Sequence, residues 1–150
     1  MKRTITKISF IAIMLCVVML AVNCKKDETT TTPPTDARDK FIGNFHMSDS
    51  SQLQMTGAPW QTSTLDIVIT KNPTDASKII ITNLNKVGYT TTANVSASIF
   101  IITNQAFGPM PNNTISGSGK FENNKLSYEY SINTSGGGLI IRGQGTKFTK

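Results

Sequence analysis

Few residues of this chain have the types and spacing that catalysis requires. His46 is the only histidine, and alternation places it beside Phe45 on the opposite face of a strand, which predicts a solvent-facing position. Serine and threonine are so abundant that any spacing to His46 would match a catalytic triad by chance. Histidines, cysteines and acids do not cluster as a metal site requires. We therefore expect no catalytic residue, no metal and no other cofactor.

The acidic residues are also too scattered to predict chemistry. A glycosidase needs two carboxyl groups in one cleft, whereas Glu122 and Glu129 flank an expected hairpin on its polar side and Asp66 lies in another expected strand. Asp36 and Asp39 lie in or beside a polar segment where we expect them to be solvated. Gly136-Gly137-Gly138 is followed by neither Lys-Ser/Thr nor a helix, so it predicts a turn rather than a phosphate loop.

Cys24 is the residue to which the sequence assigns a specific chemical role. The other cysteine, Cys16, lies in the apolar run Ile8–Val22, which is interrupted only by Ser9 and follows the basic residues 1–7 (MKRTITK). This run has the length of a signal-peptide core and is short for a bilayer span, which needs about 20 apolar residues. With residues 1–23 removed, Cys24 has no partner for a disulfide, and acylation explains its position.

The residues around Cys24 resemble those of a known class of lipoprotein. Ala21-Val22-Asn23-Cys24 resembles a lipobox, from which it departs because Asn23 is larger than the usual residue and Leu20 lies one place too early. The stretch 24–28 (CKKDE) resembles the start of Bacteroidota-type lipoproteins, in which Asn before Cys is tolerated and an acidic cluster resembles a surface-export signal. The resemblance implies a thioether-linked diacylglycerol on Cys24, a further acyl chain such as palmitate on the freed amine, and an outer-membrane, lipid-anchored protein exposed to the periplasm or the cell surface.

Residues 24–38 are expected to form a tether between the lipid and the folded domain. They contain no large apolar residue, and their threonines and Pro33-Pro34 favour an extended, solvated backbone. The net charge of +6 includes Lys2, Arg3 and Lys7 of the signal peptide, so the mature chain carries about +3 without a basic cluster. Nucleic acid is therefore not an expected partner, whereas a membrane is, through the N-terminal lipid.

Residues 39–150 have the alternating pattern of an all-β domain. Phe41, Gly43, Phe45 and Met47 share one face, as do Leu53 and Met55, then Leu65, Ile67 and Ile69, and later Leu126, Tyr128, Tyr130 and Ile132. The continuous apolar runs Ile79–Ile81 and Ile99–Ile102 predict strands buried on both faces or at a barrel wall. Tyr128 and Tyr130 are expected in the core.

Short breaker segments divide this domain into eight or nine strands. They include Gly57-Ala58-Pro59, Asn72-Pro73, the tight turn expected at Asn123-Asn124 and the glycines 136–138, after which the last strand is expected at 139–148. Short connections favour antiparallel neighbours, and closure removes the open edges of the sheet. We expect a small up-and-down β-barrel, with a two-sheet sandwich as the alternative. Glycines 117, 119, 143 and 145 alternate within strands, as strong curvature or close packing requires.

The first expected strand resembles the opening strand of lipocalin-like domains. Asp39-Lys40-Phe41-Ile42-Gly43-Asn44-Phe45 is similar to the segment in which Gly-x-Trp enters that barrel, with Phe45 in place of the Trp. The resemblance implies that Phe45 plugs a closed end of the barrel.

Three loop residues are candidates for ligand binding. Trp60 lies in a breaker segment and could stack on a sugar, insert into a partner or cap the core. Phe107 and Met110 lie in a second apolar loop (FGPMP), and together the two loops could rim a ligand-binding mouth. We expect a non-enzymatic envelope protein that binds a small apolar ligand, a glycan or an envelope partner. The alternatives are an envelope hydrolase whose site the sequence does not reveal and a structural or inhibitory surface module.

Overall fold

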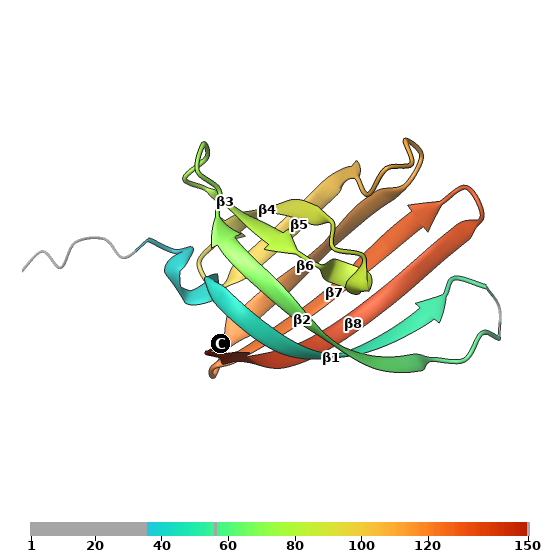
Figure 1. Ribbon diagram of the computed structural model, residues 1–150, viewed down its shortest axis with the longest axis horizontal. Coiled ribbons are helices and arrows are strands. Elements are labelled where there is room, and N and C mark those ends of the chain that lie inside the picture. The colour runs from blue at the N-terminus through green and yellow to red at the C-terminus, as the bar shows by residue number, and fades with distance from the viewer. Residues whose placement is uncertain (1–35, 56, 150) are drawn as a thin grey trace, which may run out of the picture. The chain divides into compact units, whose positions relative to one another are not determined.

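The computed structural model describes residues 36–55 and 57–149, which form one closed, antiparallel, up-and-down β-barrel with its strands in chain order (Figure 1). The predicted barrel is therefore confirmed, and the sandwich alternative is wrong. Cys24, the predicted signal peptide and most of the predicted tether lie outside the described residues. The eight strands are β1 (Gly43–Leu53), β2 (Gln61–Lys71), β3 (Lys78–Thr82), β4 (Thr90–Ser96), β5 (Ile99–Ala106), β6 (Thr114–Glu122), β7 (Lys125–Thr134) and β8 (Gly137–Phe148).

The strand connections gather at two opposite ends of the barrel. The loops after β1, β3, β5 and β7 lie at one end, which we call the loop end, and the loop after β3 contains the 3₁₀ helix η2 (Leu84–Lys86). The connections after β2, β4 and β6 lie at the other end, which we call the tether end, with the 3₁₀ helix η1 (Asp39–Phe41) that precedes β1. Neither short helix of the described part is long and apolar enough to cross a membrane.

The alternating apolar residues point into the barrel and form its core. The predicted alternating apolar residues of β2 and β7 are buried, as are Phe45 and Met47 of β1, whereas Leu53 at the end of β1 is 53% exposed. Of the two alternatives expected for the run Ile99–Ile102, a strand of the barrel wall is confirmed and burial on both faces is wrong, because Phe100 and Ile102 are buried while Ile99 and Ile101 are 47% and 50% exposed. The barrel wall is one layer thick, so alternate residues of a strand must face solvent even in an apolar run.

The conformations of two asparagines explain the short β6–β7 turn. The starts of β1 and β8 differ from the prediction. Asn123 and Asn124 both adopt left-handed φ angles, of 49° and 62°, as the predicted tight β6–β7 turn requires. β1 begins at Gly43, because Phe41 belongs to η1, and it continues without interruption to Leu53. β8 begins at Gly137, two residues earlier than expected, because Gly137 pairs with Thr134.

Close packing explains the alternating glycines in β6 and β8. Each of the four lies against large inward side chains or the neighbouring backbone, which an added Cβ would meet. Gly119 leaves room for Phe100, and Gly145 leaves room for Met47. These positions allow aromatic and sulfur-containing side chains to fill a narrow barrel.

Aromatic side chains fill the tether end. Phe41 is fully buried and packs edge-on against Phe100, with ring centroids 5.8 Å apart, and Phe45 packs against Phe121 at 6.1 Å. The Lys147 ammonium group lies 5.7 Å from the Phe45 ring and donates a hydrogen bond to the carbonyl of Lys40. This end of the barrel is therefore closed, and any access to the interior must come from the loop end.

Candidate ligand-binding site

A pocket of about 320 Å³ lies at the loop end, where all four hairpin connections contribute residues. Its wall is mostly apolar, and the polar groups come from Asn85, Asn113, Thr134 and backbone at Gly136–Gly138. The principal apolar lining residues are Leu53, Met55, Val87, Tyr89, Phe107, Ile132 and Leu139. A concave apolar site with a few polar groups is the usual form of a small-molecule site, and its volume is at the lower end of that range.

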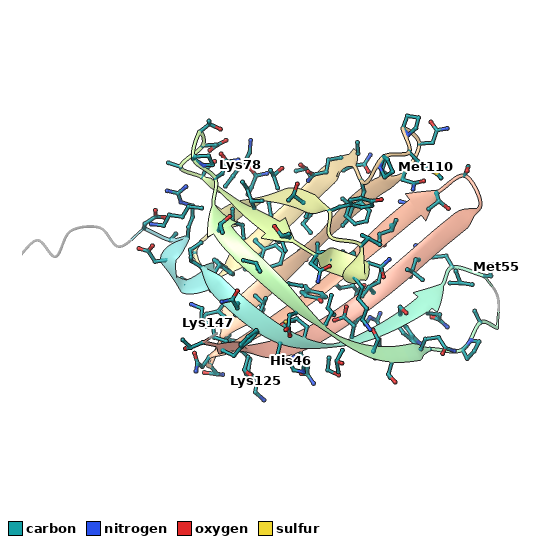
Figure 2. The ribbon with its side chains drawn as sticks, viewed as in Figure 1. His46, Met55, Lys78, Met110, Lys125 and Lys147 are labelled. Atoms are coloured by element: carbon teal, nitrogen blue, oxygen red, sulfur yellow. The ribbon has the colours of Figure 1, made fainter. Side chains whose placement is uncertain are left out.

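The rim of this pocket exposes large apolar side chains to solvent. Leu53, Met55, Val87 and Tyr89 are between 38% and 64% exposed. Figure 2 shows Met55 at the loop end, with Lys78 and Lys147 toward the tether end. Single exposed apolar residues need no explanation, whereas four around one pocket make this rim a candidate contact surface for a ligand or a partner.

An ionisable group lies deeper in the barrel than the pocket. Asp49 is on the inner face of β1, is only 4% exposed, and accepts a hydrogen bond of 2.7 Å from the Tyr128 hydroxyl. Both side chains lie beside Gly143, which pairs with Asp49 on one side and with Tyr128 on the other. A side chain at Gly143 would meet both of them. Gly143 therefore provides the space in which this contact forms.

Burial alters the ionisation of this pair. It raises the pKa of Asp49, an effect that the Tyr128 hydrogen bond and the Lys86 charge offset only in part. It also raises the pKa of Tyr128, which the negative charge of Asp49 raises further. The Tyr128 hydroxyl thus remains a donor at neutral pH, and the barrel interior disfavours the charged form of Asp49.

Two buried hydroxyl groups near the loop end lack a partner among the described residues. They are the Tyr130 hydroxyl and the Thr91 Oγ1. The backbone of Asn85 lies close to the Tyr130 hydroxyl without forming a hydrogen bond of good geometry. Unpaired buried polar atoms are unfavourable, so they mark places where water or a ligand atom could bind.

Of the three predicted ligand-binding residues, only Phe107 lines the pocket. It is buried and packs edge-on against Tyr89, with ring centroids 5.6 Å apart. Met110 lies in the same loop and is 63% exposed, outside the pocket wall (Figure 2). Trp60 also lies at the loop end, but it packs on the outer surface with the Arg142 guanidinium 5.1 Å from its ring centroid.

The other candidate residues for chemistry are paired on the surface. His46 is exposed, as predicted, with Nδ1 2.7 Å from the Asp66 carboxylate, and Glu129 accepts a hydrogen bond from Arg142. Asp36 and Asp39 are not simply solvated, because Lys71 forms ion pairs with both and Arg38 with Asp36. Histidines, cysteines and acids of the described part form no group of three that could hold a metal.

The sequence interpretation missed Asp49. The inward position of Asp49 could have been predicted, because extending the alternation Phe45, Met47 by two residues places Asp49 on the same face. Its partner could not have been predicted, because Tyr128 lies 79 residues away in the chain. The contact depends on β8 lying between β1 and β7, which only barrel closure produces.

Comparison with protein-family models gives no match to this chain, and comparison with curated proteins also gives none.

Proposed function

We propose that this protein is a lipid-anchored cell-envelope protein whose barrel is a non-enzymatic binding module for a small apolar ligand. The observation that carries the binding proposal is the loop-end pocket, with its apolar wall and exposed apolar rim. The anchoring proposal rests on the sequence around Cys24.

The size of the pocket limits the ligand. An apolar cavity of about 150 Å³ is large enough to bind benzene, and the pocket here has about twice that volume, 320 Å³. A ligand of one or two rings, or the end of an acyl or alkyl chain, fits this space. The pocket is open to solvent, so a longer ligand can extend out of it.

Two observations favour a small apolar ligand over a glycan ligand and over a hydrolase activity. The Arg142 guanidinium lies over the Trp60 ring, which leaves less of that ring available to stack on a sugar. Asp49 is the only buried carboxyl group among the described residues, and its hydrogen-bond partner is the Tyr128 hydroxyl rather than a second acid, which does not favour hydrolysis by a pair of carboxyl groups.

The binding proposal is tested with a neutral fluorescent apolar probe, N-phenyl-1-naphthylamine, and the purified full-length protein. Val87→Glu introduces a charge into the pocket rim at a residue that is 42% exposed, so folding is little affected. We expect this variant to bind the probe at least about tenfold more weakly, because burying a carboxylate against an apolar ligand is unfavourable.

Ile101→Glu is the matched control, since Ile101 is similarly exposed but lies on the outer face of β5, away from the pocket. The control should bind the probe as the unmodified protein does. Equal losses in both variants, or no binding of any apolar probe to the unmodified protein, would overturn the proposal.

A further inference from the structure

The Asp49 carboxylate is unusually poorly satisfied for a buried charge. An ionised carboxylate has about four acceptor positions, yet the hydrogen bond from Tyr128 is the one contact of this kind that Asp49 makes within the described residues. Lys86 supplies a positive charge from η2, but its side chain is exposed and does not hydrogen bond to Asp49. A carboxylate held in this way can accept further donors.

Two tyrosines extend this polar group toward the loop end. The rings of Tyr128 and Tyr130 pack with centroids 5.3 Å apart, and both rings are almost completely buried. The negative charge of Asp49 acts on Tyr130 as well as on Tyr128. Tyr130 is also one of the two residues whose buried hydroxyl lacks a partner among the described residues. One carboxylate and two aromatic rings with hydroxyl groups thus lie together inside the barrel.

Asn85 separates this polar group from the pocket. It lines the pocket, and its backbone also lies close to the Tyr130 hydroxyl. Asn85 and Lys86 of η2 both have left-handed backbones, with φ of 56° and 59°. Backbone strain of this kind is concentrated at ligand clamps and switches. Asp49 lies four residues below the rim residue Leu53, a distance of about 13 Å along an extended strand.

The chemistry of this group matches a cationic amine. A carboxylate provides charge and acceptors, and electron-rich tyrosine rings favour a positive charge near their faces. We propose that Asp49, with Tyr128 and Tyr130, binds the ammonium head of an alkylamine whose hydrocarbon part occupies the loop-end pocket. This inference rests on the proposed binding function and specifies the ligand class. Displacement of Asn85 opens the path between the two parts of the site.

The test compares two ligands that share a chain and differ in the head group, octylamine and 1-octanol. Their affinities for the full-length protein are measured by displacement of the neutral fluorescent probe at pH 7, where the amine is charged. We expect the unmodified protein to bind octylamine at least about tenfold more tightly than 1-octanol, as a charge-assisted hydrogen bond provides. In Asp49→Asn this preference should disappear.

Glu129→Gln is the matched control, because Glu129 is an exposed acid on the outer face of the same strand as Tyr128. It should retain the full preference for the amine. Tyr130→Phe keeps the ring and removes only the hydroxyl, so it should reduce the preference even if Asp49→Asn folds poorly.

The outcomes separate this inference from the proposed function. Equal affinities for amine and alcohol in the unmodified protein, or a preference that survives both Asp49→Asn and Tyr130→Phe, would overturn the ammonium site while leaving the apolar pocket intact. Failure of both ligands and of the probe to bind would overturn the binding function itself.

Discussion

Asp49 places an ionisable group where the barrel would otherwise be apolar, and this position has a consequence for stability. Burial raises the pKa of the folded-state carboxyl group above its ordinary value of 3.8, so the folded protein binds this proton more tightly than the unfolded chain does. Well below pH 3.8, Asp49 is protonated in both the folded and the unfolded protein, so its burial has no charge-related cost. As pH rises through the raised pKa, the buried carboxyl group becomes charged, and the cost of burying this charge lowers the free energy of unfolding.

Asp49→Asn should remove this pH dependence. The asparagine carbonyl can still accept the Tyr128 hydrogen bond, and the asparagine side chain carries no charge at any pH. We expect the free energy of unfolding of Asp49→Asn, relative to that of the unmodified protein, to rise between pH 4 and pH 7. Urea unfolding of both proteins at the two pH values gives this difference, in which the other carboxyl groups cancel. A difference that stays constant with pH would show that burial does not perturb Asp49.

At the scale of strands, β4 and β5 share the fewest paired residues of any two neighbours in the barrel. Their register contains three residue pairs, and β5 then shifts register against β6 between Ile102 and Gln105. Beyond these pairs, the Gln105 side chain of β5 forms the hydrogen bonds to β4 that a neighbouring strand backbone would otherwise form. Its Oε1 accepts hydrogen bonds from the Thr92 N–H and hydroxyl, and its Nε2 donates to the Thr92 carbonyl at 2.8 Å. One carboxamide therefore satisfies both backbone groups of Thr92.

Gln105→Ala should weaken the contact between β4 and β5. Loss of the carboxamide leaves the Thr92 backbone groups without their partners, so we expect the free energy of unfolding to fall by about 1–3 kcal/mol. Hydrogen exchange at the Thr92 amide should become faster at the same time. Gln144→Ala, at an exposed glutamine on the outer face of β8, should change neither quantity. If Gln105→Ala behaved like this control, the contact between β4 and β5 would not depend on the Gln105 side chain.

The elements of this fold were more predictable than its contacts. Period-two alternation, the Asn123-Asn124 turn and the short connections are local signals, and they predicted strands, meander and barrel closure. Gln105 and Asp49 act through partners that lie 13 and 79 residues away in the chain. Their roles depend on register and closure, so one polar residue among many in a strand pattern gives no local sign of them. Phe107 was identified because it lies in an apolar loop, whereas Val87 and Leu53 have no such distinguishing context.

At the scale of the whole molecule, the described chain begins at the end of the barrel opposite the pocket. The Arg38 guanidinium is 11% exposed, pairs with Asp36 and donates hydrogen bonds to the carbonyls of Asn72 and Asp75 in the β2–β3 loop. Lys71 adds ion pairs to Asp36 and Asp39. These contacts fix the start of the described chain at the tether end. The chain upstream of residue 36 therefore joins the barrel at the tether end, opposite the pocket.

The lipid on Cys24 remains a prediction, and Cys24→Ala tests it separately from ligand binding. We expect this variant to lose labelling by a fatty-acid analogue and to leave the membrane fraction, because two or more acyl chains, each contributing about 0.8 kcal/mol per buried CH₂, are needed for stable anchoring. The pocket is built entirely from residues downstream of Cys24, so the released protein should bind the neutral probe with unchanged affinity.

Cys16→Ala is the control, since Cys16 lies in the predicted signal peptide and its loss should affect neither labelling nor release. Labelling that persists in Cys24→Ala would exclude Cys24 as the acceptor. Release accompanied by loss of probe binding would instead show that the ligand reaches the pocket only at a membrane surface.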